Sequence, residues 1–491
     1  MPETVRFLLR GEVVTVGPEL PHTTTVLDYL RLKQRLCGTK EGCAEGDCGA
    51  CTVAVADLDG DKLRYRAVNS CIQLVGQLDG KALVTVEDLA PDEPGGDALH
   101  PVQQAMVDCH GSQCGFCTPG FVMSLFAHYK TGTPTDTDSL CDTLAGNLCR
   151  CTGYRPILEA GQTMGAAPDR FSALEAAWIG KLKGLKRREG LRQETPAGRF
   201  LAPISLDELM TLLRGVDWDD TWVLGGGTDV GLWITKQHRR IGTILHLGQI
   251  AALKRVEILP DEVSIGASVT YTDAMPAIAA LHPDFAAMVR RLGSVQIRNA
   301  GTIGGNIANG SPIGDSMPPL IALGARLQLL SPGGERFLPL DEFFLGYRKT
   351  YLRPRGVVAK VIVPRPGPES RFAVYKLSKR LDQDISAVLG AFHVIMEGNR
   401  IASARIAYGG MAAIPQRAHA AELALQGQKL TTEAVEPAVA ALAQDFTPMS
   451  DMRASARYRL LAAQNLLRKF AAEQQTGAQI RIEAPIEQVA E

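Results

Sequence analysis

The positions of the cysteines constrain this chain more than any other feature, because eight of the eleven fall into two closely spaced sets in its first third. Cys43, Cys48 and Cys51 have the spacing C-x4-C-x2-C, and Cys71 follows further along the chain. Four thiolates at this spacing are typical of a plant-type 2Fe-2S cluster. The first set therefore predicts an iron–sulfur site rather than a disulfide.

The second set consists of Cys114 and Cys117, spaced C-x2-C, followed by Cys149 and Cys151, spaced C-x-C. The first pair comes just before a helical pattern that begins at Thr118 and Pro119, where the helix macrodipole favours thiolate charge. Short cysteine pairs also occur in four-cysteine structural zinc sites. Spacing alone favours a second iron–sulfur cluster but leaves tetrahedral zinc as an alternative.

Composition limits the remaining possibilities. A chain of 491 residues with 45% apolar content is expected to form about three domains. The formal charge of -1 gives no electrostatic reason to expect nucleic acid or an anionic membrane as a partner. The first residues contain too short an apolar run for a secretory signal, and no run is long enough to span a bilayer, so we expect a cytoplasmic protein. We expect Cys37, Cys109 and Cys141 to be small buried hydrophobic residues.

Alternating apolar residues predict strands near both ends of the chain. The expected strands cover 5–9, 14–16, 52–58, 63–68, 372–377, 387–395 and 401–408. A short helix is expected after Thr24 or Thr25, and a late helix is indicated by Leu460, Ala463, Leu467 and Phe470. Residues 181–199 contain many lysines and arginines and little apolar periodicity, which predicts a basic, solvated connector.

Two glycine-rich loops in the middle of the chain could approach a phosphate closely. Gly225 to Asp229 reads GGGTD after a probable strand, and Ala300 to Asp315 reads AGTIGGNIANGSPIGD. Neither matches a P-loop or a Rossmann fingerprint, and each alone is weak evidence. Both loops together, in a chain with two cysteine sets, favour a dinucleotide cofactor. Flavin suits this role because it accepts electrons singly and releases them in pairs.

These motifs together resemble those of the molybdenum hydroxylases over nearly the whole chain. EGCAEGDCGACTV, QCGFCTPGFVMS and GNLCRCTGYRPI are similar to the two iron–sulfur domains of that family, and WVLGGGTDVG, IRNAGTIGGNIANGSPIGDSMPPL and YRKTYLRP resemble its flavin domain. YKLSKRLDQDIS is similar to the xanthine dehydrogenases of the family in their bacterial two-subunit form. The resemblance implies 2Fe-2S clusters at both cysteine sets.

The resemblance implies a multidomain α+β protein. The expected parts are a β-grasp 2Fe-2S ferredoxin-like domain (1–88), a helical-bundle 2Fe-2S domain (89–165), a basic linker (166–196), a vanillyl-alcohol-oxidase-type FAD domain (197–370), a domain like the carboxy-terminal part of carbon monoxide dehydrogenase flavoproteins (371–475), and a polar tail (476–491).

By matching position, the resemblance also implies the residues that contact the flavin and the nicotinamide. The expected FAD contacts are Leu224, Gly225, Gly226, Gly227, Thr228, Asp229, Gly301, Thr302, Gly304, Gly305, Asn306, Asn309, Ser311, Pro312, Asp315, Val358 and Lys376. Tyr347 and Arg348 are expected where the nicotinamide approaches. Gln383 stands where animal relatives have an acidic residue near the flavin, so the flavin electrostatics of those enzymes do not transfer.

The function implied by the resemblance is electron transfer in a xanthine-dehydrogenase-type enzyme. Electrons from purine hydroxylation at a molybdopterin centre would pass through both clusters to FAD and leave as hydride to NAD. The expected domains account for the chain, so we expect molybdopterin on a separate large subunit, docked near the second cluster in a dimer of heterodimers. The alternatives are the same role in an aldehyde or N-heterocycle hydroxylase, and a non-enzymatic metal-binding redox sensor.

Overall fold

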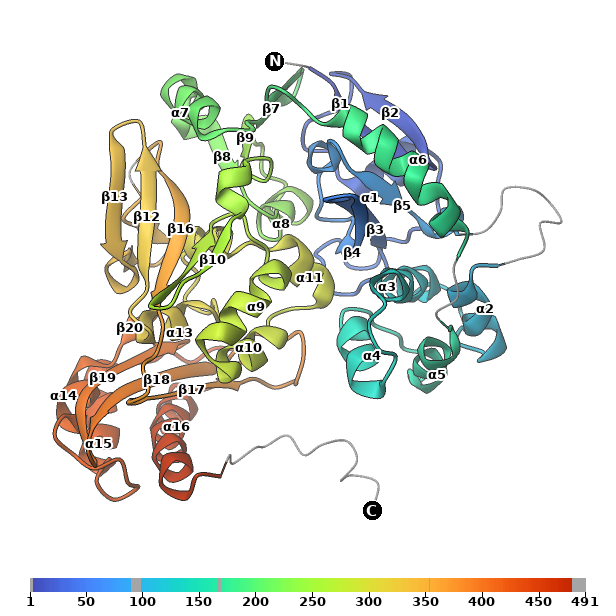
Figure 1. Ribbon diagram of the computed structural model, residues 1–491. Coiled ribbons are helices and arrows are strands. Elements are labelled where there is room, and N and C mark those ends of the chain that lie inside the picture. The colour runs from blue at the N-terminus through green and yellow to red at the C-terminus, as the bar shows by residue number, and fades with distance from the viewer. Residues whose placement is uncertain (1–2, 90–98, 166–168, 353, 479–491) are drawn as a thin grey trace.

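The computed structural model describes residues 3–89, 99–165, 169–352 and 354–478 of the chain (Figure 1). Parts of five expected segments lie outside the described residues, namely 1–2 of the ferredoxin-like domain, 90–98 of the helical domain, 166–168 of the linker, 353 of the FAD domain and 479–491 of the polar tail. Within the described residues, no helix is both long enough and apolar enough to cross a membrane.

The amino-terminal domain is a five-stranded mixed sheet of order β2-β1-β5-β3-β4. Its strands are β1 (Val5–Leu9), β2 (Glu12–Val16), β3 (Thr52–Asp59), β4 (Lys62–Asn69) and β5 (Ala82–Val84). The predicted hairpin and the predicted strand pair at 52–68 are confirmed by antiparallel pairing. Helix α1 (Val26–Asp28) begins after Thr25, whose hydroxyl accepts from the amide of Asp28, and continues as a short π-helix over Tyr29–Lys33.

The two faces of this sheet pack against different neighbours, because side chains alternate along a strand. Leu8 and Ala54 face the helical domain, in a core that includes Phe126. Phe7 and Val55 face the opposite way, in a core that continues into Phe200 and Ile244 of the next domain. The ferredoxin-like sheet therefore shares apolar cores with both of its neighbours, which fixes its place between them.

Four helices form the second domain beside the sheet: α2 (Pro101–Asp108), α3 (Thr118–Thr131), α4 (Thr137–Leu144) and α5 (Arg155–Thr163) (Figure 1). Helix α3 begins at Thr118, and Cys117 rather than Thr118 occupies the N-cap position. Buried Phe121, Leu125 and Phe126 of α3 join the core with the ferredoxin-like sheet. Cys114 and Cys117 therefore precede a helix that is anchored on one side by a packed core.

The segment expected as a basic linker (166–196) is folded over most of its described residues, and the solvated connector expected at 181–199 overlaps a helix and two strands. Helix α6 (Arg170–Leu185) buries Phe171, Trp178 and Leu182 against the ferredoxin-like sheet, and β6 (Leu191–Thr195) already belongs to the next domain. Arg187 is almost fully buried and forms an ion pair with Asp79. The density of positive charge had obscured the helical spacing of these apolar residues, which starts before the basic run.

The third domain contains two larger sheets and a two-stranded antiparallel sheet formed by β14 and β15. The first, of order β6-β7-β9-β8, is mainly parallel; the second, of order β10-β11-β16-β12-β13, is antiparallel. The strands not yet defined are β7 (Gly198–Ala202), β8 (Thr221–Leu224), β9 (Thr243–His246), β10 (Val256–Ile258), β11 (Glu262–Gly266), β12 (Arg326–Ser331), β13 (Gly334–Pro339), β14 (Phe344–Gly346), β15 (Lys349–Thr350) and β16 (Val357–Pro364).

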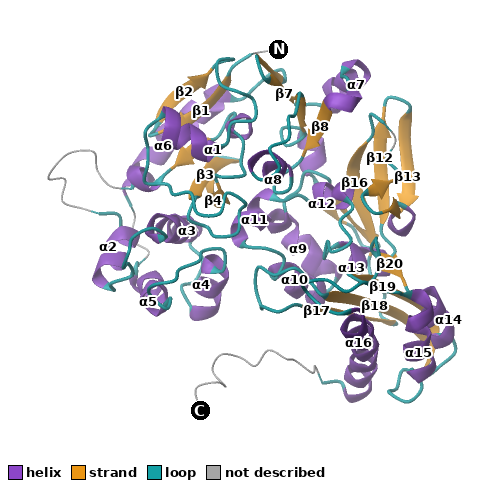
Figure 2. Cartoon of the chain, turned by 180° about the vertical axis from the view of Figure 1, so that it is seen from behind, coloured by secondary structure: helices purple, strands orange, loops and turns teal. Residues whose placement is uncertain are grey.

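Helices connect and cover the two sheets (Figure 2). They are α7 (Leu206–Gly215), α8 (Val230–Thr235), α9 (Tyr271–Leu281), α10 (Pro283–Arg290), α11 (Val295–Ala300), α12 (Ile303–Asn309) and α13 (Met317–Ala322). The short helix α11 lies against the ferredoxin-like domain, where the Asn299 side-chain amide donates to the carbonyl oxygen of Ala67 in β4 at 2.9 Å. This contact makes α11 the main helical link between the two domains.

The carboxy-terminal domain packs an antiparallel sheet against three helices. The sheet has the order β17-β18-β19-β20. Its elements are β17 (Ser370–Leu377), β18 (Val388–Glu397), β19 (Arg400–Gly409), β20 (Gln416–Arg417), α14 (His419–Leu425), α15 (Glu436–Asp445) and α16 (Ala456–Thr476). The three predicted strands are confirmed, and so is the late helix, whose Ala463, Leu467 and Phe470 are fully buried. The multidomain α+β class is therefore confirmed.

Candidate cofactor site

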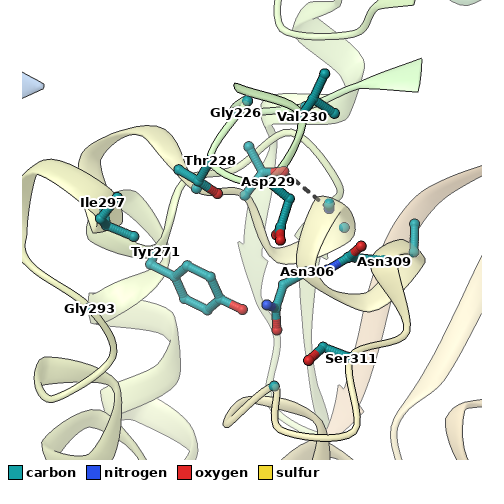
Figure 3. A pocket seen from close by; sticks show the side chains of 18 of the residues that line it. Gly226, Thr228, Asp229, Val230, Tyr271, Gly293, Ile297, Asn306, Asn309 and Ser311 are labelled. Atoms are coloured by element: carbon teal, nitrogen blue, oxygen red, sulfur yellow. Dashed lines mark hydrogen bonds between the residues drawn. The ribbon is translucent and has the colours of Figure 1, made fainter. Parts of the chain in front are cut away.

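The main cavity has a volume of about 650 Å³ and lies where the two glycine-rich loops face each other. The turn from Gly225 to Asp229 forms one wall, and the segment from Gly301 to Asp315, which includes α12, forms the facing wall. Figure 3 shows Thr228 and Asp229 on one side of this space and Asn306, Asn309 and Ser311 on the other. Strand β8 places the first loop and buried α12 places the second.

Close backbone packing explains why these loops need glycine. A β-carbon on Gly226 would lie 1.8 Å from the carbonyl oxygen of Ala300, and one on Gly304 would lie 2.3 Å from the β-carbon of Ala267. Backbone amides can therefore approach a ligand without intervening side chains. The two loops form a cradle suited to a phosphate-containing ligand.

Most of the expected flavin contacts line the cavity. Those that do are Gly225, Gly226, Gly227, Thr228, Asp229, Gly301, Thr302, Gly304, Gly305, Asn306, Asn309, Ser311, Asp315, Val358 and Lys376. Leu224 and Pro312 do not belong to the lining. Leu224 is instead fully buried in the apolar core behind the loop, so its side chain supports the turn.

Tyr347 and Arg348 also lie outside the lining, but Arg348 is close to it. Burial raises the pKa of Asp229, while the Arg348 guanidinium and a hydrogen bond with Asn309 act in the opposite direction. The Tyr347 ring is 60% exposed, and the Arg348 guanidinium lies 5.6 Å from its centroid. This exposed ring and the adjacent cation therefore flank the cavity rather than fill it.

A buried ion pair closes the side of the cavity next to β17. Lys376 Nζ donates to Asp315 Oδ2 at 2.6 Å and to the carbonyl oxygen of Arg291 at 3.1 Å. The Ser386 hydroxyl donates to the other carboxylate oxygen of Asp315 at 2.6 Å. Because these buried charges are paired and hydrogen-bonded, the second glycine-rich loop is tied firmly to the carboxy-terminal domain.

Several lining residues were not predicted as contacts. Tyr271 points into the cavity in Figure 3; its hydroxyl lies 2.8 Å from Ser316 Oγ, and burial raises the pKa of Tyr271. Asp384 and Ile385 belong to the loop between β17 and β18. Gln383, whose flavin environment was left open, lies in the same loop, and among the described residues its buried Nε2 has no hydrogen-bond partner. An unpaired buried donor in a cavity wall fits a ligand that supplies an acceptor there.

The ferredoxin-like domain contributes directly to this cavity. Glu45, Gly46 and Asp47, which stand between Cys43 and Cys48, line it alongside Ile297 of α11. Gly46 has a φ of 84°, and a β-carbon there would lie 2.7 Å from Ile72 and 3.3 Å from Ile297. The loop that holds the first cysteine set thus forms part of the cavity wall, which sequence spacing alone could not have revealed.

The four thiols of the first set lie together. Cys43 is within hydrogen-bonding reach of both Cys48 and Cys71, and Cys71 is within reach of Cys51. Contact with Cys48 and Cys71 lowers the pKa of Cys43, while the same contacts raise the pKa values of Cys48 and Cys71. The four thiols therefore form one closely interacting group, which suits a site that binds several thiolates.

The second set is also assembled, but closer to solvent. Cys114 is within reach of Cys151, and Cys117 is within reach of Cys149. Burial, followed by contact with Cys149, raises the pKa of Cys117 to about 12. Two thiol pairs provide two ligands for each iron of a dinuclear cluster. Within the described part of the chain, no three His, Cys, Asp or Glu side chains are placed to surround a single metal ion.

The three remaining cysteines are less buried than expected. Cys37 is exposed, and Cys109 and Cys141 are partly exposed. Cys37 lies in the loop after the π-helix, where its carbonyl oxygen accepts a hydrogen bond from Lys40. The expectation that Cys37, Cys109 and Cys141 are buried hydrophobic residues was therefore wrong, most clearly for Cys37.

Four sequence profiles match the chain in succession. They are described as a 2Fe-2S iron–sulfur cluster binding domain (15–75), a [2Fe-2S] binding domain (85–162), an FAD binding domain in molybdopterin dehydrogenase (195–366), and a CO dehydrogenase flavoprotein C-terminal domain (373–474). Each profile covers one part of the cofactor arrangement described above.

Curated relatives include xanthine dehydrogenase of Emericella nidulans, which is 33% identical over 90% of this chain and 36% of the relative. Xanthine dehydrogenase/oxidase of Gallus gallus is 30% identical over 84% of this chain and 36% of the relative. The chain spans about a third of the length of these relatives.

Among solved structures, a carbon monoxide dehydrogenase from Hydrogenophaga pseudoflava is 30% identical, with a TM-score of 0.52 over 55% of this chain and 94% of that one. Quinoline 2-oxidoreductase from Pseudomonas putida 86, at 24% identity and a TM-score of 0.52, covers 57% of this chain and 96% of that chain and supports the fold alone. The chain belongs to the molybdenum hydroxylase family. Within that family it has the iron–sulfur and flavin domains typical of the small subunit, and its curated relatives are xanthine dehydrogenases.

Proposed function

We propose that this chain is the electron-transfer subunit of a cytoplasmic xanthine dehydrogenase that oxidises hypoxanthine and xanthine with NAD. Electrons would come from a molybdopterin centre on a larger partner subunit, in a dimer of heterodimers. When bound, 2Fe-2S clusters carry single electrons, and FAD collects two of them for hydride transfer to NAD. The chain's own residues hold these groups and set the distances between them.

The observation that carries the proposal is the shared wall between the first cysteine set and the cavity. Glu45, Gly46 and Asp47 line the cavity and are flanked by Cys43 and Cys48. A cluster held by these thiols would therefore be adjacent to a ligand in the glycine-lined cavity. Burial, followed by the charges of Glu45 and Cys43, raises the pKa of Asp47, so further negative charge at this wall is unfavourable.

The residues present fit FAD in three respects. The two loops offer bare backbone at Gly226 and Gly304, where a side chain would clash. The unpaired Nε2 of Gln383 supplies a donor in the cavity wall. Lys376 and Asp315 neutralise each other, so this wall presents no isolated charge to an uncharged ring. We assign no acid or base, because hydride transfer requires positioning above all.

The exposed second cysteine set supports a docking site for the partner subunit. Cys114 and Cys151 are exposed, and Phe116, Leu148 and Tyr154 around them are 48%, 46% and 38% exposed. Apolar side chains beside exposed thiols suit contact with another protein surface rather than with water. We propose that the molybdopterin-binding subunit covers this face, which would place its centre next to the second cluster.

Tyr347 and Arg348 are proposed to guide the nicotinamide. The exposed Tyr347 ring offers a surface for stacking, and the cation of Arg348 next to it suits the phosphates of a dinucleotide. Because these residues flank the cavity rather than line it, they would contact the second nucleotide and leave FAD binding largely unchanged.

The direct test is substrate-driven NAD reduction by the complex purified with its partner. We expect reduction with hypoxanthine and xanthine, and loss of that activity in Cys43→Ser or Cys149→Ser while FAD stays bound. Activity only with aldehydes or other N-heterocycles would support the second candidate, the same role in another molybdenum hydroxylase; the similarity to a carbon monoxide dehydrogenase keeps this candidate open. Zinc in place of iron, with no flavin, would support a redox sensor instead.

A further inference from the structure

One buried polar group connects the three cofactor-binding domains. The side-chain amide of Gln296, on α11 of the flavin domain, donates to Thr52 Oγ1 at 3.3 Å, Ser124 Oγ at 3.1 Å and Asn147 Oδ1 at 3.0 Å. Thr52 directly follows Cys51, whereas Ser124 lies on α3 and Asn147 lies two residues before Cys149. All four side chains are at most 2% exposed. We call these four residues the Gln296 hub.

Two hydroxyl hydrogens of the Gln296 hub already take part in other hydrogen bonds, and this determines which of its groups can still donate. The Thr52 hydroxyl donates to the carbonyl oxygen of Gly49 at 2.7 Å, and the Ser124 hydroxyl donates to Asn147 Oδ1 at 2.7 Å. These hydroxyl oxygens and Asn147 Oδ1 therefore have only lone pairs to offer. Gln296 must present its NH2 group to them, and its buried Oε1 finds no partner in the part of the chain that the structure describes.

The Oε1 side of the Gln296 amide is tightly packed, so the side chain has no room to shift. A β-carbon on Gly146 would lie 2.0 Å from Gln296 Oε1, and a β-carbon on Gly49 would lie 2.2 Å from the carbonyl oxygen of Gly146. Asn147 Nδ2 also donates to the carbonyl oxygen of Gly49 at 3.1 Å. The loops of the two cysteine sets thus contact each other at Gly49 and Gly146, and the Gln296 side chain packs closely against this contact.

The residue next to Gln296 extends this arrangement to the cavity. Ile297 lines the cavity and is packed beside Gly46 of the first cysteine loop. Neighbouring helix positions are rigidly related, so a displacement of Gln296 must also displace Ile297. Helix α11 therefore couples the positions of both cysteine loops to the position of the cavity wall.

We propose that Gln296 is a positioning residue that sets the distance and the electronic coupling between the two clusters and between the first cluster and the flavin. This inference rests on the proposed function, because it requires that both cysteine sets hold clusters. It adds a specific role for a residue that binds no cofactor itself. Gln296→Leu keeps a side chain of similar length but removes every hub hydrogen bond from the flavin domain.

The test is electron paramagnetic resonance of the reduced full-length chain, with iron and flavin content measured on the same samples. We expect Gln296→Leu to retain iron and FAD but to show a weakened or heterogeneous magnetic interaction between the two reduced clusters. Exchange of the Leu148 amide, which donates to the carbonyl oxygen of Cys48, should accelerate about fivefold, since a lost buried hydrogen bond contributes about 1 kcal/mol. Wild-type interaction and exchange in the variant would overturn the proposal.

The matched control is Gln193→Leu. Gln193 is also a buried glutamine that links the flavin domain to the ferredoxin-like domain, because its amide donates to the carbonyl oxygen of Gly17 at 2.9 Å. It contacts neither cysteine loop, so we expect unchanged magnetic interaction. An equal change in both variants would point to general domain loosening and contradict the proposal.

Failure of the variant to fold and absence of cluster signals in the wild-type chain have different meanings. If Gln296→Leu does not fold, Ser124→Ala removes one partner only and should produce the same change in a smaller degree; wild-type behaviour of that variant would then overturn the proposal. If the wild-type chain itself shows no cluster signals, the proposed function fails rather than the role of Gln296.

Discussion

The backbone amide of Leu148 donates a hydrogen bond to the carbonyl oxygen of Cys48 at 3.0 Å. Cys48 is a member of the first cysteine set, and Leu148 directly precedes Cys149 of the second. One hydrogen bond therefore connects the two sets, with the Gln296 hub beside it. The sets belong to different domains, so their proximity depends on packing between domains.

Replacing one cysteine of either set should prevent that set from binding its cluster and leave the other cluster in place. We expect Cys43→Ser and Cys149→Ser each to lower the iron content from about four to about two per chain. FAD should remain bound, because the cavity is lined chiefly by the flavin domain. Iron analysis and visible spectra measure this, with Cys37→Ser as the exposed-cysteine control. Loss of all iron from either variant would contradict two independent clusters.

Gly226→Ala should abolish or severely weaken FAD binding. The new β-carbon would lie 1.8 Å from the carbonyl oxygen of Ala300, so the two loops would have to separate. The flavin-to-protein ratio after purification is the measurement. Gly180→Ala is the control, because nothing lies within 4 Å of its added β-carbon in helix α6, where alanine is favoured by up to about 1 kcal/mol. Full flavin content in Gly226→Ala would show that this loop is not the cradle.

Lys376→Met should destabilise the protein by about 3–5 kcal/mol, because it leaves the Asp315 carboxylate buried without its cation. The double variant Lys376→Met/Asp315→Asn should recover much of that loss, since it removes the charge as well. Thermal unfolding followed by released flavin fluorescence compares the three proteins. Equal instability of the single and double variants would argue against the ion pair as the cause.

Gln383→Glu should lower the reduction potential of the bound flavin. A carboxylate in the cavity wall disfavours the added electrons, and an effect of about 1 kcal/mol corresponds to roughly 20 mV for a two-electron couple. Gln383→Leu, which loses the donor without adding charge, separates the two contributions. Redox titration at pH 7 provides the comparison. An unchanged potential in Gln383→Glu would place this side chain away from the flavin.

His246 should make the flavin domain less stable in mild acid. Burial lowers the pKa of His246 to about 3, and its Nδ1 lies 3.3 Å from the carbonyl oxygen of Leu224 at the start of the first loop. Since the unfolded state binds this proton first, stability is lost as pH falls from about 6.5 towards 3. The expected loss by pH 5 is about 2 kcal/mol. Urea unfolding at pH 7.5 and 5.0 should show a smaller difference in His246→Asn.

Local patterns predicted the parts of this fold that depend on neighbours in sequence. The hairpin at 5–16, the cap at Thr25 and the strands of the carboxy-terminal domain follow from alternation and capping chemistry. Helix α6 was missed because its buried residues, such as Trp178, precede a strongly basic run. A helical plot over 170–185 would have revealed its apolar face.

Only those parts of the site that belong to a recognisable sequence motif could be predicted. The glycine-rich loops indicated two facing walls of the cavity, but Glu45, Ile297 and Gln383 come from three segments far apart in the sequence. Their meeting depends on how the ferredoxin-like and carboxy-terminal domains pack on the flavin domain. No local periodicity encodes such packing, and so the Gln296 hub could not have been inferred before the structure.

The most direct test of the central claim is a cofactor count on the full-length chain purified without oxygen. We expect about four iron atoms and one FAD per chain, with two distinct paramagnetic signals after reduction. A colourless protein that holds zinc at either cysteine set and no flavin would contradict it.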